Sequence, residues 1–129
     1  MKTTLLAALS LDGGWVTPRL AAPELAAFLR LAGKGPVWTD LSPRPGLRAA
    51  SRRELARRAQ QEPLRLLPSP ALAAALLERE GPLRLLLWWR PELPAGQRRT
   101  LVPPGAPRAL FTLRRTRKLG GGIVGVYER

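Results

Sequence analysis

Two short stretches, residues 3–11 and 83–89, are apolar at nearly every position, and they constrain the fold more than any other feature of the chain. Neither reaches the roughly 18 residues that a transmembrane helix requires. Because successive side chains of a strand point to opposite faces, we expect Leu85, Leu87 and Trp89 on one face and Leu86 and Trp88 on the other. A strand that is apolar on both faces needs cover on both sides, as in a parallel sheet flanked by helices. The sequence therefore predicts an α/β protein.

Helical and extended segments alternate along the rest of the chain. Helices are expected from Pro23 to Gly33, from Ser51 to Gln61 and from Ser69 to the Gly81-Pro82 pair, with Ser51 and Ser69 as N-caps. Further strands are expected at 37–39 and 64–67, a loop at 91–107, and a terminal hairpin at 110–118 and 123–127 around a glycine triplet, 120–122. Residues 1–129 thus predict one domain, with a mixed and mainly parallel twisted sheet flanked by helices and a C-terminal antiparallel β-hairpin.

The composition excludes several kinds of chemistry. The chain has neither histidine nor cysteine, which removes thiolate and imidazole nucleophile pairs and the common transition-metal ligands, so no metal site is expected.

The chain carries 22 Lys+Arg against 9 Asp+Glu, a net charge of +13. Such a surface attracts anions, phosphate above all, although an arginine bias of the genome would produce the same composition. We expect a cytoplasmic protein without a membrane partner.

The end of the first apolar stretch is a candidate site. Ser10, Asp12 and Gly13 follow a strand directly, and ligands of open α/β sheets gather at the carboxyl ends of strands. Asp-Gly is also the strongest short turn signal, and residues 15–17 would then form a returning strand. The spacing alone favours the turn.

Three stretches carry a resemblance to a known family. ALSLDG (8–13), LPSPALAAALLEREGPLRLLLWWRPEL (67–93) and LFTLRRTRKLGGGIVGVYER (110–129) are similar to the first strand, the late helix-strand unit and the closing hairpin of the dihydrofolate-reductase-like family. The likeness is greatest to the reductase domain of riboflavin biosynthesis. It implies an NADPH-dependent reductase of a pyrimidine or pteridine-like ring, with a phosphorylated small-molecule substrate and a homodimeric assembly.

The resemblance also implies roles for individual residues. Ser10, Asp12 and Gly13 would border the substrate. Arg44 and Arg48, in a segment that resembles the phosphate-binding segment of that domain, would hold the ribityl phosphate of the substrate. Thr39 and Ser69 would contact NADPH.

The chain departs from the family pattern at both expected cofactor contacts. Val37-Trp38-Thr39-Asp40 stands where the family has Gly-x-x-Thr, and Pro68-Ser69-Pro70 replaces a glycine-rich turn. Pro70 removes one backbone N–H from a helix start that would otherwise bind phosphate. Capping of this helix explains Ser69 adequately, and the spacing favours this interpretation over anion binding. The chain is also shorter than the family pattern by a strand-helix unit or more.

A second function class follows from the charge. A non-catalytic relative with the same fold would bind nucleic acid or another anionic partner through two basic clusters. These clusters consist of Arg52, Arg53, Arg57 and Arg58 in the second helix and Arg114, Arg115, Arg117 and Lys118 in the hairpin. Few aromatic residues accompany them for base stacking. Trp15, beside the glycines, is a candidate wall for a planar ring.

Overall fold

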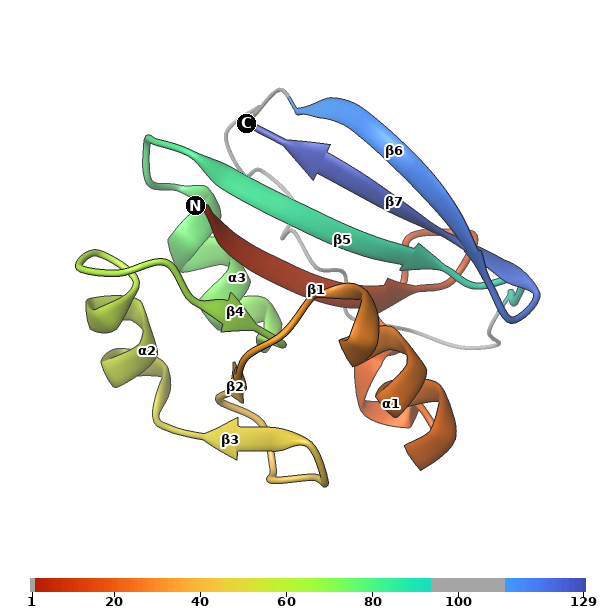
Figure 1. Ribbon diagram of the computed structural model, residues 1–129, viewed down its shortest axis with the longest axis horizontal. Coiled ribbons are helices and arrows are strands. Elements are labelled where there is room, and N and C mark those ends of the chain that lie inside the picture. The colour runs from red at the N-terminus through yellow and green to blue at the C-terminus, as the bar shows by residue number, and fades with distance from the viewer. Residues whose placement is uncertain (1, 94–110) are drawn as a thin grey trace.

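A computed structural model describes residues 2–93 and 111–129, which form a seven-stranded sheet with helices on both faces (Figure 1). The strands are β1 (Thr3–Leu9), β2 (Val37–Thr39), β3 (Leu47–Ala49), β4 (Arg65–Leu66), β5 (Leu83–Trp89), β6 (Thr112–Leu119) and β7 (Gly122–Glu128). The helices are α1 (Ala22–Leu31), α2 (Arg52–Arg58) and α3 (Pro70–Leu77), with one 3₁₀ turn, η1 (Thr17–Arg19).

The first strand lies in the interior of the sheet, as the sequence predicts. The strand order is β3-β2-β4-β1-β5-β7-β6, and the first five strands of this order run parallel to one another. Strand β1 pairs with β5 along its whole length, from Thr3 opposite Leu83 to Leu9 opposite Trp89. Strands β7 and β6 complete the sheet in antiparallel orientation. The predicted fold class is therefore confirmed.

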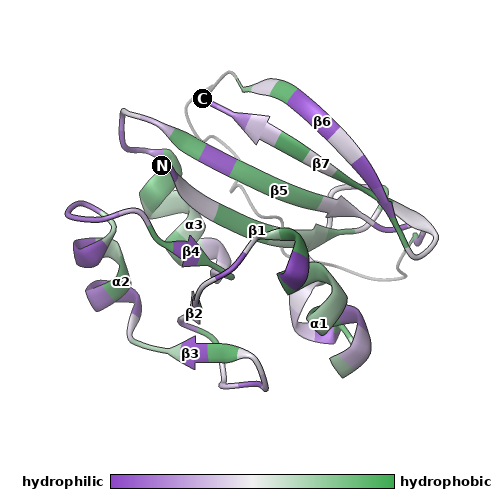
Figure 2. Ribbon diagram, viewed as in Figure 1, coloured by the Kyte–Doolittle hydropathy of each residue, from purple (hydrophilic) through white to green (hydrophobic). Residues whose placement is uncertain are grey.

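Each face of the central strands packs against its own helices. Leu5, Ala7 and Leu9 of β1 join the core beneath α2 and α3, whereas Leu6 and Ala8 join the core beneath α1. Strand β5 alternates in the same way, as its sequence predicts. Figure 2 shows the result, with apolar β1 and β5 in the middle and polar residues concentrated in α2 and β6.

Both predicted serine caps are present. The Ser51 hydroxyl accepts a hydrogen bond from the Glu54 amide at 3.1 Å, and the Ser69 hydroxyl accepts one from the Leu72 amide at 3.2 Å. Each satisfies a backbone donor that a helix start leaves without an intrahelical partner.

Several predicted boundaries are wrong. The first strand ends at Leu9, because residues 10–14 form a turn, and α2 and α3 end at Arg58 and Leu77. Strand β3 was not expected, because it directly follows residues 40–46, whose two prolines and glycine favour a loop. Residues 94–107 of the predicted loop and residue 110 of the predicted hairpin lie outside the described residues.

None of the helices in the described ranges is long and apolar enough to cross a membrane.

Candidate functional site

The turn after β1 is built around the Ser10 hydroxyl. Ser10 is fully buried, its Oγ accepts a hydrogen bond from the Gly14 amide at 3.0 Å, and it donates to a carboxylate oxygen of Asp12. Gly13 adopts a φ of +84°, which glycine tolerates better than any other residue. Leu9 and Trp15 then pair in an antiparallel bridge. The turn is confirmed, and it assigns structural contacts to Ser10, Asp12 and Gly13. The returning strand expected at 15–17 is wrong, because the pairing stops at this single bridge and Thr17 begins η1.

A residue that the sequence analysis missed completes this turn. The Thr17 hydroxyl is buried and accepts a hydrogen bond from the Ala8 amide at 2.9 Å. The Ala8 carbonyl in turn accepts from the Val16 amide at 2.9 Å. No sequence motif marks Thr17, because its role depends on the chain folding back onto β1.

The carboxyl ends of β2 and β4 meet at the start of α3. The Thr39 hydroxyl is buried, donates to the Leu67 carbonyl at 2.7 Å and accepts from the Leu41 amide at 3.0 Å. Asp40, the next residue, accepts from the Ser69 amide at 2.7 Å and from the Ser69 hydroxyl at 2.5 Å. The structure thus brings the two predicted cofactor contacts, Thr39 and Ser69, to neighbouring positions, with internal hydrogen-bond partners for both.

The two predicted phosphate-binding arginines contact different faces of the sheet. Arg44 Nη2 donates to the carbonyl of Leu20, 2.6 Å away, and Leu20 belongs to the core beneath α1. The Arg48 guanidinium lies 5.7 Å from the ring centroid of Trp38, which packs against the core beneath α2 and α3. The two guanidinium groups therefore have separate partners within the chain.

A hollow at the carboxyl ends of β1 and β5 lies beside the turn. Its volume is about 240 Å³, and Val16, Arg19, Leu20, Arg90 and Glu92 line it. Arg90 connects the walls through ion pairs with Glu24 at 2.7 Å and Glu92 at 3.1 Å, and Glu92 also pairs with Arg19 at 2.8 Å. The cations and carboxylates of this hollow therefore already neutralise one another.

Two members of these ion pairs, Glu24 and Arg90, have shifted pKa values. The pKa of Glu24 is lowered, first by the hydrogen bond from the Ala21 amide and then by Arg90. Burial opposes the charge of Arg90, but its hydrogen bonds with Glu24 and Glu92 raise its pKa above the ordinary value. Arg90 also stacks 4.7 Å from the ring centroid of Trp88. Glu24 and Arg90 therefore stay charged near neutral pH, which does not suit either of them to proton transfer.

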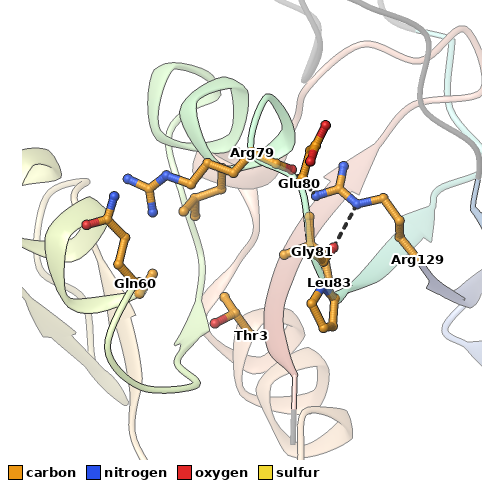
Figure 3. A pocket seen from close by; sticks show the side chains of 10 residues that line it. Thr3, Gln60, Arg79, Glu80, Gly81, Leu83 and Arg129 are labelled. Carbon is orange, nitrogen blue, oxygen red and sulfur yellow. Dashed lines mark hydrogen bonds between the residues drawn. The ribbon is translucent and has the colours of Figure 1, made fainter.

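A larger hollow lies at the opposite, amino end of β1 and β5. It measures about 350 Å³ and lies among Thr3, Leu83 and the C-terminal ends of α2 and α3 (Figure 3). The arginines on its walls bind backbone carbonyls. Arg79 donates to Ala56 at 2.8 Å, and Arg129 donates to Gly81 at 3.1 Å, the bond drawn in Figure 3. The arginines of this hollow therefore cap the C-terminal ends of α2 and α3.

No cluster of three or more metal-binding side chains occurs within residues 2–93 and 111–129.

Comparison with known proteins supports the fold. No family model matches this chain, and no curated protein matches it. Among solved structures, dihydrofolate reductase from Schistosoma mansoni is similar, with a TM-score of 0.53 and 11% sequence identity over 99% of this chain and 97% of that chain. The chain therefore has a dihydrofolate-reductase-like fold, and at this identity the similarity concerns the fold alone.

Proposed function

We propose that this protein is a non-catalytic, anion-binding protein with a dihydrofolate-reductase-like fold, whose partners include nucleic acid. The observation that carries the proposal is the bond between Asp40 and Ser69 at the start of α3. In the predicted reductase, this helix start would hold a phosphate of NADPH.

The residues at the start of α3 do not fit a dinucleotide phosphate. The Ser69 amide already donates to Asp40 and the Leu72 amide to the Ser69 hydroxyl, while Pro70 has no N–H to offer. A phosphate placed there would also face the Asp40 carboxylate. Two unit charges about 4 Å apart near a protein surface repel by about 4 kcal/mol. We therefore derive no hydride transfer through NADPH at this position.

The charge distribution supports anion binding elsewhere on the surface. Glu24, Glu54, Glu62, Glu92 and Glu128 all form ion pairs. Asp12 and Asp40 bond to serines, and most of the basic excess is therefore left without an acidic partner. Exposed arginines line α2 and β6, where Figure 2 shows strongly polar ribbon. A surface of this kind binds polyanions with a strong dependence on salt.

The test is a pair of titrations of the purified protein. We expect a single-stranded RNA oligonucleotide to bind with an affinity that falls linearly with salt on logarithmic axes. NADPH, followed by tryptophan fluorescence, should give no saturable response. Saturable NADPH binding together with salt-insensitive or absent RNA binding would overturn the proposal.

The second candidate function is the reductase of a pyrimidine or pteridine-like ring that the riboflavin-type resemblance implies. One observation favours it. The indole N–H of Trp15, beside the turn after β1, is buried without a hydrogen-bond partner among the described residues, so it is a donor for a ring substituent. The NADPH titration decides between the two candidates. The phosphorylated small-molecule substrate and the homodimeric assembly that the resemblance implies are part of this second candidate function only.

A further inference from the structure

A third hollow lies on the face of the sheet covered by α1, away from the carboxyl ends of the strands. Its volume is about 220 Å³, between the C-terminal end of α1 and strands β5, β7 and β6. Its floor is apolar and its rim is basic. The lining residues are Arg30, Leu31, Gly33, Leu86, Arg115, Arg117, Val124 and Val126.

The pairing of the strands explains why two arginines of β6 face this hollow. Arg115 lies opposite Val126 and Arg117 opposite Val124, and both valines belong to the core beneath α1. A β-bulge shifts the register between Leu113 and Arg115. Without the extra residue, Arg115 and Arg117 would point to the other face, because side chains alternate along a strand. Bulges commonly re-aim side chains at functional positions.

The three guanidinium groups around this hollow have no counterion within the chain. Arg30, Arg115 and Arg117 are exposed and form no ion pair with any described residue, whereas the neighbouring Arg114 pairs with Glu128. Residues 94–110 contain no acidic residue, so they supply no carboxylate either. Like charges around one hollow repel one another, and a bound anion would relieve that repulsion.

We propose that this hollow binds a small organic anion, with a phosphate or carboxylate group held by Arg30, Arg115 and Arg117 and a short apolar part against Leu86 and the two valines. Arginine suits this task because its planar fork binds an oxyanion through two parallel hydrogen bonds. A volume of about 220 Å³ suits one charged group and a few carbons or a single ring. The proposal adds a discrete site to the diffuse anion binding of the proposed function.

The test uses phenyl phosphate, which combines a dianion with one ring, and isothermal titration calorimetry. We expect saturable binding of one molecule per chain. The double variant Arg115→Gln/Arg117→Gln should weaken it at least about tenfold, because charge-assisted hydrogen bonds are lost. The matched control is Arg52→Gln/Arg53→Gln, which removes the same charge from exposed positions of α2. Its affinity should stay within about twofold of the unmodified protein.

The outcomes separate this site from the proposed function. Absent binding, or equal weakening by the two double variants, would overturn the site, even if RNA still binds. Far-UV circular dichroism and thermal melting verify that both variants fold. Arg115→Lys/Arg117→Lys keeps the charge and lacks the planar fork, so intermediate weakening supports the site, whereas an unchanged affinity for phenyl phosphate contradicts guanidinium recognition.

Discussion

Asp40 and Ser69 are joined by two hydrogen bonds, of 2.7 Å to the Ser69 amide and 2.5 Å to its hydroxyl. The carboxylate thereby connects the end of β2 to the start of α3, 29 positions further along the chain. A negative charge at this helix start is favourable, because the free N–H groups carry a partial positive charge there. In a reductase, the phosphate of a bound cofactor would supply the negative charge at this helix start. Here the Asp40 carboxylate supplies it.

Removing the Asp40 carboxylate should destabilise the protein. Asp40→Ala leaves the Ser69 amide and hydroxyl without their acceptor, and we expect a loss of about 1–3 kcal/mol in the free energy of unfolding. Urea denaturation at neutral pH measures it. Ser69→Ala, which removes the cap and the hydroxyl that donates to Asp40 but keeps the Ser69 amide contact, should cost about 1–2 kcal/mol. Equal stability of Asp40→Ala and the unmodified protein would contradict a structural role for this contact.

Arginines from other parts of the chain bind the C-terminal end of each α-helix described. Arg65 donates to the Ala32 carbonyl after α1 at 2.7 Å, and Arg79 binds Ala56 near the end of α2. At the end of α3, Arg129 donates to Leu77 at 3.0 Å, to Arg79 at 2.5 Å and to Gly81 at 3.1 Å. Cations are favourable at this end of a helix. Part of the arginine content therefore stabilises the fold.

Arg129 should matter most among these contacts, because it satisfies several carbonyls at once. Arg129→Leu should lower the free energy of unfolding by about 1–3 kcal/mol, since these carbonyls lose a charged donor. Thermal and urea denaturation report the change. The matched control, Arg53→Leu on the exposed face of α2, should stay within about 0.5 kcal/mol of the unmodified protein. A comparable loss in both variants would mean that net charge, and not helix capping, sets the effect.

The stability should depend on pH through Glu128. Hydrogen bonds from Arg84 and Lys2 lower the pKa of this carboxyl below its ordinary value of 4.5. Because the pKa is lower in the folded state, the contribution of Glu128 is present above the ordinary pKa and is lost as the pH falls through the folded pKa. We expect Glu128→Gln to be less stable at neutral pH and to lose less stability on acidification. Parallel pH profiles of the two proteins would contradict this assignment.

Local sequence patterns predicted the central fold well. The alternation placed the five side chains from Leu85 to Trp89 on the correct faces of β5, and Ser51 and Ser69 marked two helix starts. These signals succeed because the causes lie within a few residues. Strand β3 escaped prediction because its pairing with β2 outweighs the local preference for a loop.

Features that depend on distant residues could not be predicted. The arginine caps join positions such as Arg65 and Ala32, and the bulge of β6 exists only in relation to β7. The contact between Asp40 and Ser69 likewise joins residues that are distant in the sequence. Resemblance to a family suggested a role at the cofactor for Ser69, but only the structure reveals that its amide and hydroxyl already donate to Asp40.

Gly122 should resist substitution, although the sequence marks it only as part of a turn. The structure distinguishes the members of the glycine triplet 120–122. Gly120 has a φ of +57°, whereas a Cβ on Gly122 would collide with the backbone carbonyl of Trp89. We expect Gly122→Ala to cost about 2 kcal/mol or more, because β7 would be pushed away from β5. Gly121→Ala is the control, since the nearest described atom that its Cβ would meet is Pro91 Cγ, at 3.2 Å. Equal melting temperatures of the two variants would contradict the close approach.

Arg44 and Arg48 provide a test of the phosphate clamp that the resemblance implies. Arg44→Leu removes the hydrogen bond to the Leu20 carbonyl and should destabilise the fold by about 1–2 kcal/mol. Arg48→Leu removes only a partly exposed stacking contact with Trp38 and should cost less than about 1 kcal/mol. If the two guanidinium groups shared one phosphate, both variants would weaken the binding of a sugar phosphate to a similar extent. Because their contacts lie on different faces of the sheet, we expect ribose 5-phosphate affinity to be unchanged in both, measured by calorimetry. Parallel weakening would show that the loop rearranges to form a clamp, and it would favour the reductase over the anion-binding function.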